Sequence, residues 1–268
     1  METRNVLITG ASSGIGRACG LYLHEHGFRV YGTSRRGSFD GNPFAMLQMD
    51  VSDDASIQHG VDTIIKRDGR IDIVVNNAGI AIAGPLESTS ISEAQHQLDI
   101  NFFGAFRVCR AVLPVMRRQR GGYIVSIGSI GGQIAIPYQS LYSASKFALE
   151  GMMEALRLEV RPFGVRVVLI EPGDTRTPIT LNRTKAAEAA TQNAYQSYSA
   201  ALKRMEDDER NGPAPEGVAR LLKRILNTPN PRLRYTVGPA VQRAAVWLKR
   251  LLPNGLVEYG MRKYYGLE

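Results

Sequence analysis

Short apolar runs rich in β-branched residues alternate along this chain with longer segments of helical periodicity. Seven runs are expected to be strands, namely residues 6–9, 29–33, 45–49, 71–76, 123–127, 165–170 and 234–237. Runs that are apolar throughout are typical of strands buried on both faces of a parallel sheet. The alternation therefore predicts an α/β fold in which helices cover both faces of one parallel sheet.

The longer segments predict helices at residues 14–26, 99–120 and 139–161, and Pro114 is expected to kink the second. Residues 178–211 are alanine-rich, polar and charged, so they predict one or two helices of low intrinsic stability. A Gly-Pro-Ala-Pro run ends this segment, and a new helix is expected to begin near its last proline. No linker divides the chain, and residues 1–268 are expected to form one domain.

Composition narrows the class of protein. The chain has 268 residues, 44% of them hydrophobic and 22% charged, which suits a soluble globular enzyme. No apolar run predicts a membrane span, and the N-terminus lacks a signal-peptide pattern. Cys19 and Cys109 are expected to be small core residues in a reducing cytoplasm, and no ligand spacing around them predicts a metal site. We therefore expect a cytoplasmic location.

The net charge of +8 falls entirely in the last part of the chain, where residues 217–268 hold ten Lys/Arg and two Asp/Glu. A solvated basic face is the favoured interpretation, with attraction to anionic lipid or an acidic partner as the alternative. Residues 241–252 are amphipathic and basic. They are expected to cover the sheet edge or a pocket rather than to lie on a membrane. No nucleic-acid-binding module is visible.

A glycine-rich loop at residues 9–16 follows the first strand and opens the first helix. Gly10 allows a tight turn, Gly14 lets the backbone approach a phosphate, and Gly16 allows close helix packing. The free N–H groups of the helix N-terminus favour a pyrophosphate. The residues expected to bind a dinucleotide here are Gly10, Ser12, Ser13, Gly14, Ile15 and Gly16.

The second strand ends in Ser34, Arg35 and Arg36, where an NAD-binding protein usually has a carboxylate for the ribose 2′-hydroxyl. Because arginine pairs well with a 2′-phosphate, these residues favour NADP(H) over NAD(H). Asp50 and Val51, after the third strand, are expected to bracket the adenine.

Two further patterns lie beside the expected cofactor. Asn77, Ala78 and Gly79 follow the fourth strand, where asparagine can lock a turn and the two small residues leave room for a flat cofactor. Tyr142 and Lys146 are four residues apart and share a helix face. A nearby ammonium, together with a positive nicotinamide ring, would favour the phenolate, so that Tyr142 can exchange a proton with a substrate oxygen.

Ser129 and Ser126 are the two candidates to bind that substrate oxygen, and Ser129 is preferred because it lies later in the loop after the fifth strand.

In combination, these motifs resemble the short-chain dehydrogenase/reductase family. The matches, in family order, are Thr-Gly-x-x-x-Gly-x-Gly at 9–16, Asn-Asn-Ala-Gly at 76–79, Asn101, Ser129, Tyr142-x-x-x-Lys146 and Pro172-Gly173. The similarity covers at least residues 5–175. Residues 142–151 and 231–235 look like the 17β-hydroxysteroid and retinol dehydrogenase branch.

The resemblance implies a single Rossmann-type doubly wound sheet of about seven strands. It also implies a helical substrate lid at 178–212, a C-terminal helical extension at 239–268, and a homodimer or homotetramer formed through helices 99–120 and 139–161. Its catalytic residues would be Tyr142 as general acid/base, Lys146 on the nicotinamide ribose, Ser129 on the substrate oxygen and Asn101 in a proton relay. The nicotinamide contacts would be Pro172, Gly173, Thr175 and Thr177.

The expected function is NADP(H)-dependent interconversion of a secondary alcohol and a ketone or aldehyde. Apolar residues scattered through the lid suggest a bulky apolar substrate such as a steroid, retinoid or lipid, although they also suit packing of the lid on the core. The alternative is a non-catalytic, NAD(P)-sensing regulatory protein on the same fold. The presence of all four catalytic residues favours the enzyme.

Overall fold

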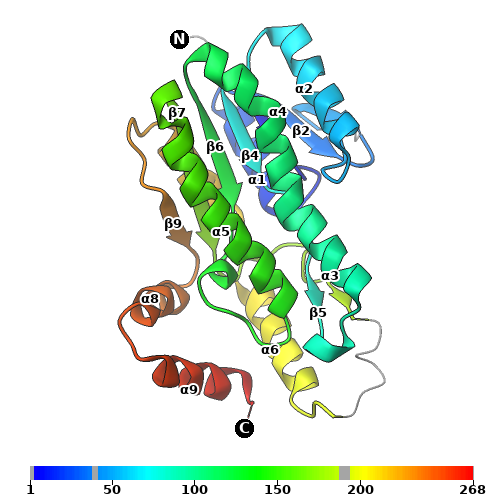
Figure 1. Cartoon of the computed structure of the whole chain (residues 1–268), viewed down its shortest axis with the longest axis vertical. Helices are drawn as coiled ribbons and strands as arrows, with labels where there is room; N and C mark the ends of the chain where they lie inside the picture. Colours follow the sequence, from blue (N-terminus) through cyan, green and yellow to red (C-terminus); the bar gives the residue numbers. More distant parts are fainter. Residues whose placement is uncertain (1–2, 38–41, 187–193, 268) are drawn as a thin grey trace.

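A seven-stranded parallel sheet forms the centre of the computed structural model, which describes residues 3–37, 42–186 and 194–267 (Figure 1). Its strands are β1 (Asn5–Ile8), β2 (Arg29–Ser34), β3 (Ala45–Gln48), β4 (Ile73–Asn76), β6 (Gly122–Ile127), β7 (Val165–Pro172) and β9 (Arg234–Val237). They lie side by side in the order β3-β2-β1-β4-β6-β7-β9, and each pair is parallel. The doubly wound, Rossmann-type sheet expected from the sequence is confirmed.

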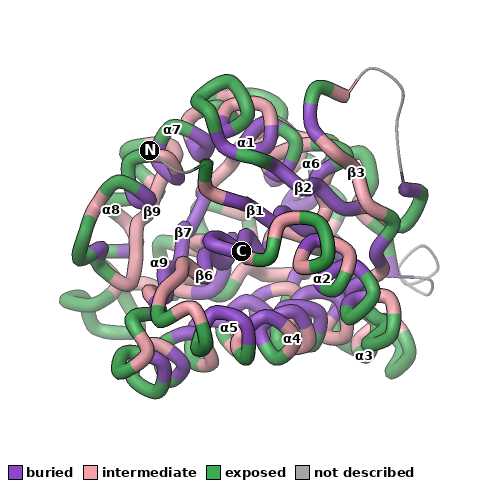
Figure 2. The backbone as a smooth tube through the Cα atoms, turned by 90° about the horizontal axis from the view of Figure 1, so that it is seen from above, coloured by how far each residue is buried: buried purple, intermediate pink, exposed green. Residues whose placement is uncertain are grey.

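Helices cover both faces of the sheet (Figure 2). One face packs against α1 (Gly14–Glu25) and α7 (Glu216–Leu226), which contribute to an apolar core with β1, β4, β6 and β7. The other packs against α2 (Asp54–Asp68), α4 (Gly104–Gln119) and α5 (Ser140–Val160). This burial on both sides explains why the central strands are largely apolar. Cys19 and Cys109 lie in these cores, as expected.

Local signals in the sequence set several helix ends. The side chain of Asp53 accepts a hydrogen bond from the Ala55 N–H at 2.9 Å and caps α2, and Gly69 ends that helix at φ +73°. Ser90 and Glu93 form a capping box at the start of α3 (Ile91–Leu98). Short 3-10 turns lie at Leu86–Ser88, Ile130–Gly132 and Arg161–Phe163.

The helix expected at residues 99–120 differs from the one observed. A π-helical turn, Asp99–Phe103, joins α3 to α4, so the helical segment begins eight residues earlier, at Ile91. Pro114 lies inside α4, which continues around it to Gln119. The wider turn is a feature that periodicity does not reveal, since it needs only one extra residue per turn.

The lid combines a helix with a small second sheet. β8 (Thr184–Lys185) pairs in parallel with β5 (Ile82–Ala83), and α6 (Tyr198–Asn211) follows. The sequence predicts the helix but not the two-residue strands, because their pairing joins segments about a hundred residues apart. Residues 187–193 of the expected lid lie outside the described residues.

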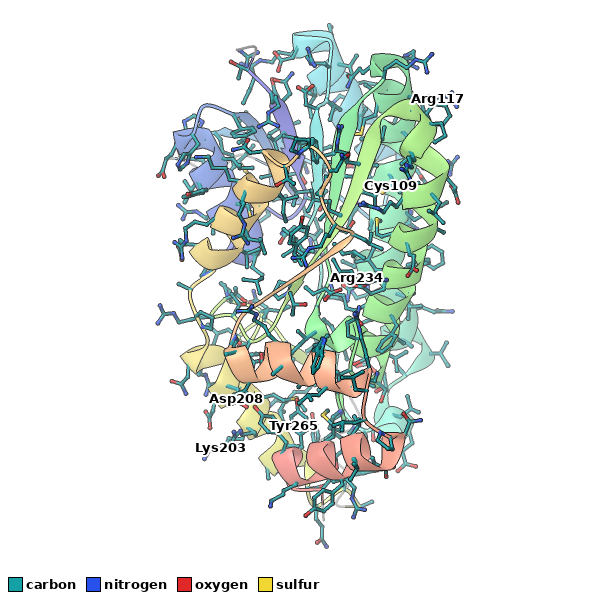
Figure 3. All side chains as sticks on the ribbon, turned by 90° about the vertical axis from the view of Figure 1, so that its left-hand side faces the viewer. Cys109, Arg117, Lys203, Asp208, Arg234 and Tyr265 are labelled. Carbon is teal, nitrogen blue, oxygen red and sulfur yellow. The ribbon has the colours of Figure 1, made fainter. Side chains whose placement is uncertain are left out.

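The C-terminal extension consists of α8 (Ala240–Lys249) and α9 (Asn254–Tyr265) (Figure 1). Val246 of α8 is buried, whereas Trp247 is 61% exposed. α9 packs against α6, where the Tyr264 hydroxyl donates to Asp208 at 2.6 Å. Figure 3 labels Asp208 and Tyr265 in this region. No helix among residues 3–37, 42–186 and 194–267 is both long and apolar enough to cross a membrane.

Candidate active site

The residues that the sequence singles out gather at one edge of the sheet. They follow the carboxyl ends of β1, β2, β4, β6 and β7, and in Figure 1 this edge faces the end of the molecule where α6 and α8 lie. Ligands of open α/β sheets bind at this edge, because loops from neighbouring parallel strands meet there. The fold therefore brings the glycine-rich loop at 9–16 and the pair Tyr142 and Lys146, which are more than a hundred residues apart, into one region.

The glycine loop has the shape that a pyrophosphate needs. Gly10 and Gly14 adopt φ values of +65° and +54°, which favour glycine. A Cβ on Gly14 would lie 3.4 Å from the Cβ of Thr177, so the loop faces the segment after β7. Ser12 and Ser13 are exposed, and the Ser13 side chain makes no bond to the N-terminus of α1, which leaves the N–H groups there open to a ligand.

Asn77 fastens this loop. Its side-chain nitrogen donates to the carbonyl oxygens of Thr9 and Gly10, at 2.9 and 3.0 Å. The Thr9 hydroxyl in turn accepts from the backbone N–H groups of Asn77 and Ala78, at 2.9 and 3.0 Å. Asn77 thus holds the glycine loop in place, and its side chain occupies the space next to Gly16.

At the expected ribose end, Arg35 and Arg36 are exposed and Ser34 donates to the Gly37 carbonyl at 3.1 Å. Asp50 lies nearby. Burial would raise the pKa of Asp50, but hydrogen bonds from Ser52 and the charge of Arg35 together hold it below its usual value. Val51 is buried against Gly104, where a Cβ would come within 2.9 Å of its side chain.

Tyr142 and Lys146 share one face of α5. The Lys146 ammonium lies 5.9 Å from the centre of the Tyr142 ring and donates to the Ile127 carbonyl at 2.9 Å. Lys146 is only 6% exposed. Its burial lowers the pKa to about 8, although Glu150 opposes this shift.

Ser129 lies beside Tyr142, whereas Ser126 does not. The Ser129 hydroxyl accepts from the Gly131 N–H at 2.9 Å. A Cβ on Gly131 would lie 3.2 Å from both Oγ of Ser129 and Cε1 of Tyr142, so the two side chains border the same glycine. Ser126 is completely buried, and its hydroxyl contacts Asn76 and Met153 inside the core. Of the two candidates, the structure brings only Ser129 to the phenol.

Asn101 is held in the π-helical turn. Its amide nitrogen donates to the Ile80 carbonyl and to the Ser145 hydroxyl, each at 3.0 Å, and its oxygen accepts from the Ile80 N–H at 2.8 Å. A cavity of about 10 Å³, enough for about one water molecule, lies among side chains that include Asn101, Lys146 and Asn76. Within the described residues, Oδ1 of Asn76 has no hydrogen-bond partner.

The protein chain itself raises the pKa of Tyr142. Burial raises it, the hydrogen bond with Ser129 lowers it, and the charges of Glu209 and Asp174 raise it further while Arg183 lowers it. The net shift of this pKa is upward, and desolvation of the phenolate is its largest cause. The phenolate is expected from Lys146 together with the positive nicotinamide ring, so that expectation stays a prediction.

The segment after β7 lies opposite the glycine loop. The Thr175 hydroxyl donates to the Gly173 carbonyl at 2.9 Å, and Thr177 lies against Gly14. Gln242 of α8 accepts from the Asp174 N–H at 2.9 Å and donates to its carboxylate. The C-terminal extension therefore supports the turn that begins at Pro172 and Gly173. A Cβ on Gly79 would lie 3.3 Å from Oδ1 of Asn101, so Gly79 lies next to the Asn101 side chain.

Buried acidic residues near Lys146 form a cluster that the sequence does not predict. Glu150 and Glu171 are 5% and 1% exposed, and both accept hydrogen bonds from Gln133. Arg234, labelled in Figure 3, lies 2.8 Å from Glu150 and 3.6 Å from Glu171. The sequence gives no signal for it, because the members come from four separate elements.

A second cluster, in the lid, was also missed. The side chain of Arg183 is 2% exposed and is paired with Glu209 of α6. The Thr180 hydroxyl donates to the same carboxylate at 2.6 Å. No group of three or more His, Cys, Asp or Glu side chains within the described residues is placed to hold a metal ion.

A parallel sheet with a dinucleotide cradle, and a tyrosine, serine and lysine beside it, defines a nicotinamide-dependent oxidoreductase of the Rossmann class. The family model described as "short chain dehydrogenase" matches residues 4–188. The chain belongs to the short-chain dehydrogenase family, and it is an NAD(P)-dependent enzyme acting on CH–OH and C=O groups.

Two relatives and one solved structure are similar to this chain over most of its length. The chain is 43% identical over 268 residues to 3-ketodihydrosphingosine reductase of Bacteroides thetaiotaomicron, with 100% of each chain covered. It is 34% identical to retinol dehydrogenase 8 of Bos taurus, over 94% of this chain and 86% of that one. A short-chain dehydrogenase from Streptomyces avermitilis has a TM-score of 0.81 at 30% identity, covering 99% and 98%. The expected likeness to retinol dehydrogenases is confirmed.

Proposed function

We propose that this protein is an NADP(H)-dependent reductase that interconverts a ketone and a secondary alcohol on a bulky, lipid-like substrate. The observation that supports the proposal is that Tyr142 and Lys146 share one face of α5, while Ser129 and Tyr142 both lie next to Gly131. The relative that is 43% identical acts, by its name, on 3-ketodihydrosphingosine, a long-chain ketone, and this compound is our first candidate substrate. Retinoid and steroid alcohols are the next candidates.

Each residue of the site has a distinct role in this proposal. Tyr142 gives a proton to the carbonyl oxygen in reduction and takes one in oxidation, and Ser129 orients that oxygen. Asn101 and the small cavity beside Lys146 provide a path for the proton that restores Tyr142. NADP(H), when bound, supplies or accepts the hydride. Pro172, Gly173, Thr175 and Thr177 border its nicotinamide end.

A regulatory protein that only senses NAD(P) is the alternative. Such a protein has no need for a proton donor held next to an oxygen-binding serine, so the intact arrangement favours the enzyme. The proposal also includes a cytoplasmic location and a homodimer or homotetramer. Exposed apolar side chains on the π-turn, α4 and α5, among them Phe106, Phe147 and Leu158, support an interface between copies.

The test of the reaction compares wild type with Tyr142→Phe in NADPH oxidation with 3-ketodihydrosphingosine. Loss of the general acid is expected to lower kcat by about 10²- to 10⁴-fold. NADPH affinity, measured by fluorescence titration, is expected to stay the same. Tyr123→Phe is the matched control, since that hydroxyl contacts Thr228 away from the site. Equal rates in wild type and Tyr142→Phe would exclude Tyr142 as the general acid.

The test of the cofactor choice is Arg35→Asp. The substitution places a carboxylate where the 2′-phosphate would lie and removes its cation. We expect the ratio of kcat/KM with NADPH to that with NADH to fall by about tenfold or more. An unchanged ratio would show that Arg35 does not bind the 2′-phosphate of NADPH.

A further inference from the structure

The two C-terminal helices, α8 and α9, leave much of their apolar surface uncovered. Within the described residues, eight of the sixteen large hydrophobic side chains that are exposed lie in residues 241–264, which we call the C-terminal surface. Exposed apolar residues are common singly, but a cluster of them usually marks a surface that binds a partner. Six members are 42–78% exposed, namely Val241, Trp247, Leu248, Leu251, Leu256 and Tyr259.

The exposed apolar residues of α8 share one face of that helix. Val241 and Leu248 are two helical turns apart, and Leu251 extends the row into the turn after the helix. A different face holds Gln242, which bonds to the turn after β7. The sequence predicts that residues 241–252 cover the sheet edge or a pocket. In the structure only one face of α8 is held against the molecule, and the apolar row stays uncovered.

The C-terminal surface is basic as well as apolar. It contains five Lys or Arg and one Glu. Arg243, Arg262 and Lys263 are exposed, and no ion pair within the residues that the structure describes involves any of the three. Lys263 lies four residues after Tyr259, on the same side of α9. Helices with exposed apolar, aromatic and cationic side chains are typical of those that lie in a membrane interface.

Charge favours an anionic bilayer over a second copy of this chain as the partner. Two C-terminal surfaces in contact would bring like charges together, which opposes association. Anionic phospholipid offers negative head groups to the cations and hydrocarbon to the apolar side chains at the same time. Each Lys or Arg near such a bilayer strengthens binding by about fivefold.

The C-terminal surface lies at the end of the molecule where the candidate active site is. α8 and α9 lie beyond the carboxyl edge of the sheet (Figure 1). Gln242 accepts from the Asp174 N–H in the turn after β7, and Lys249 donates to the Gln133 carbonyl in the segment after β6. A bilayer bound to these helices would therefore lie near the edge at which a substrate binds.

We propose that α8 and α9 dock the protein on an anionic phospholipid bilayer. The apolar side chains of the C-terminal surface insert among the head groups, and Arg243, Arg262 and Lys263 pair with lipid phosphates. The cytoplasmic leaflet carries the anionic lipids, so docking agrees with the cytoplasmic location proposed above. This inference goes beyond the proposed function and does not depend on the reaction that the site catalyses.

The experiment uses Trp247, the single tryptophan of the chain, as its probe. The whole protein is mixed with vesicles of phosphatidylcholine alone or with equal parts of phosphatidylglycerol, and the bound fraction is measured by sedimentation. We expect stronger binding to the mixed vesicles, weakened by salt because the head-group attraction is screened. Trp247 emission should shift to shorter wavelength and be quenched by brominated lipid, since the ring leaves water.

Two double variants test the two parts of the surface. Trp247→Ser with Leu251→Ser removes apolar contact, and Arg262→Gln with Lys263→Gln removes two cations. Each is expected to lower the partition coefficient on mixed vesicles by about tenfold or more. On phosphatidylcholine alone, the second variant should behave like wild type, because its two cations find no anionic lipid there.

The matched controls remove similar groups elsewhere on the molecule. Leu86→Ser with Ile91→Ser changes two apolar residues that are 63% and 75% exposed, beside and on α3. Lys66→Gln with Arg67→Gln removes two exposed cations from the last turn of α2. Both sites lie away from α8 and α9 (Figure 1), so each control should stay within about twofold of wild type.

Three results would overturn the inference. Wild type that sediments with neither kind of vesicle excludes docking. Binding that both C-terminal double variants retain in full, or binding without a change in Trp247 emission, assigns the contact to another surface. Self-association that Trp247→Ser with Leu251→Ser abolishes in light scattering, without vesicle binding, assigns the surface to a second copy.

The wild-type emission decides if circular dichroism shows that the C-terminal variants do not fold. None of these measurements needs turnover. Loss of the reductase proposal would therefore leave docking intact, and the absence of docking would leave the reductase proposal intact.

Discussion

Gly16 has very little space around its Cα. A Cβ built there would stand 2.4 Å from the side-chain nitrogen of Asn77 and 2.5 Å from the Gly10 carbonyl oxygen. Gly16→Ala would therefore push away the side chain that fastens the loop. Overpacking of this kind costs about 1–3 kcal/mol, so we expect the Kd for NADPH to rise by about 5- to 150-fold in a fluorescence titration.

Gly151 on α5 is the matched control for this substitution. A Cβ there meets nothing within 4 Å. Gly151→Ala should leave the Kd unchanged and raise the free energy of unfolding by about 0.5–1 kcal/mol, because alanine is the better helix former. A Kd that Gly16→Ala leaves at the wild-type value would mean that the loop tolerates displacement of Asn77.

The residues of the site differ in how far the sequence predicts them. Tyr142 and Lys146 are predictable because their spacing alone places them on one helix face. Arg183 is not, since its burial depends on pairing between β5 and β8 and on a carboxylate from α6. The extent to which burial raises the pKa of Tyr142 is also not predictable from the sequence, because desolvation depends on tertiary packing.

At the scale of elements, α8 connects two loops that border the site. Gln242 bonds the backbone and the carboxylate of Asp174, and Lys249 donates to the Gln133 carbonyl. We expect Gln242→Leu to leave the Asp174 carboxyl group without its donor and to loosen the turn after β7. The predicted result is a several-fold loss of kcat/KM and a destabilisation of about 1–3 kcal/mol in a denaturant titration.

Arg243, the next residue on α8, is exposed and provides the comparison. Arg243→Ala should stay within about 0.5 kcal/mol of wild type and keep its activity. If Gln242→Leu behaves in the same way, α8 does not support the active-site turn.

The elements themselves show what periodicity can and cannot predict. All seven strands of the main sheet were expected, because a run such as 73–75 is apolar on both faces. The π-turn Asp99–Phe103 and the two-residue strands β5 and β8 were not expected. Such short features are determined by tertiary contacts rather than by a repeating pattern.

At the scale of the whole molecule, the buried acidic cluster makes unfolding depend on pH. Burial and the neighbouring Glu171 raise the pKa of Glu150 to about 7, although Arg234 and Gln133 oppose the shift. The folded state therefore holds a proton that the unfolded chain releases at lower pH. Stability from this group is complete below about pH 4.5 and is lost as the pH rises toward about 7.

We expect Glu150→Gln to remove this part of the pH dependence. Relative to wild type, the variant should gain about 1–2 kcal/mol between pH 4.5 and pH 7.5, measured as free energies of unfolding in urea. Arg234 keeps Glu171 as a partner in this variant, so the fold should persist. A difference between the two proteins that is constant with pH would contradict the assignment.

The catalytic residues and the C-terminal helices come from separate parts of the chain, which affects how such an enzyme can change its substrate. The glycine loop and Tyr142 come from residues before Gly173, whereas α6, α8 and α9 lie beyond the carboxyl edge of the sheet (Figure 1). Exchange of the last third of the chain for that of another lineage would alter which molecules enter without disturbing the hydride chemistry. An enzyme of this fold could thereby acquire new substrates by replacing its C-terminal helices while keeping its catalytic residues.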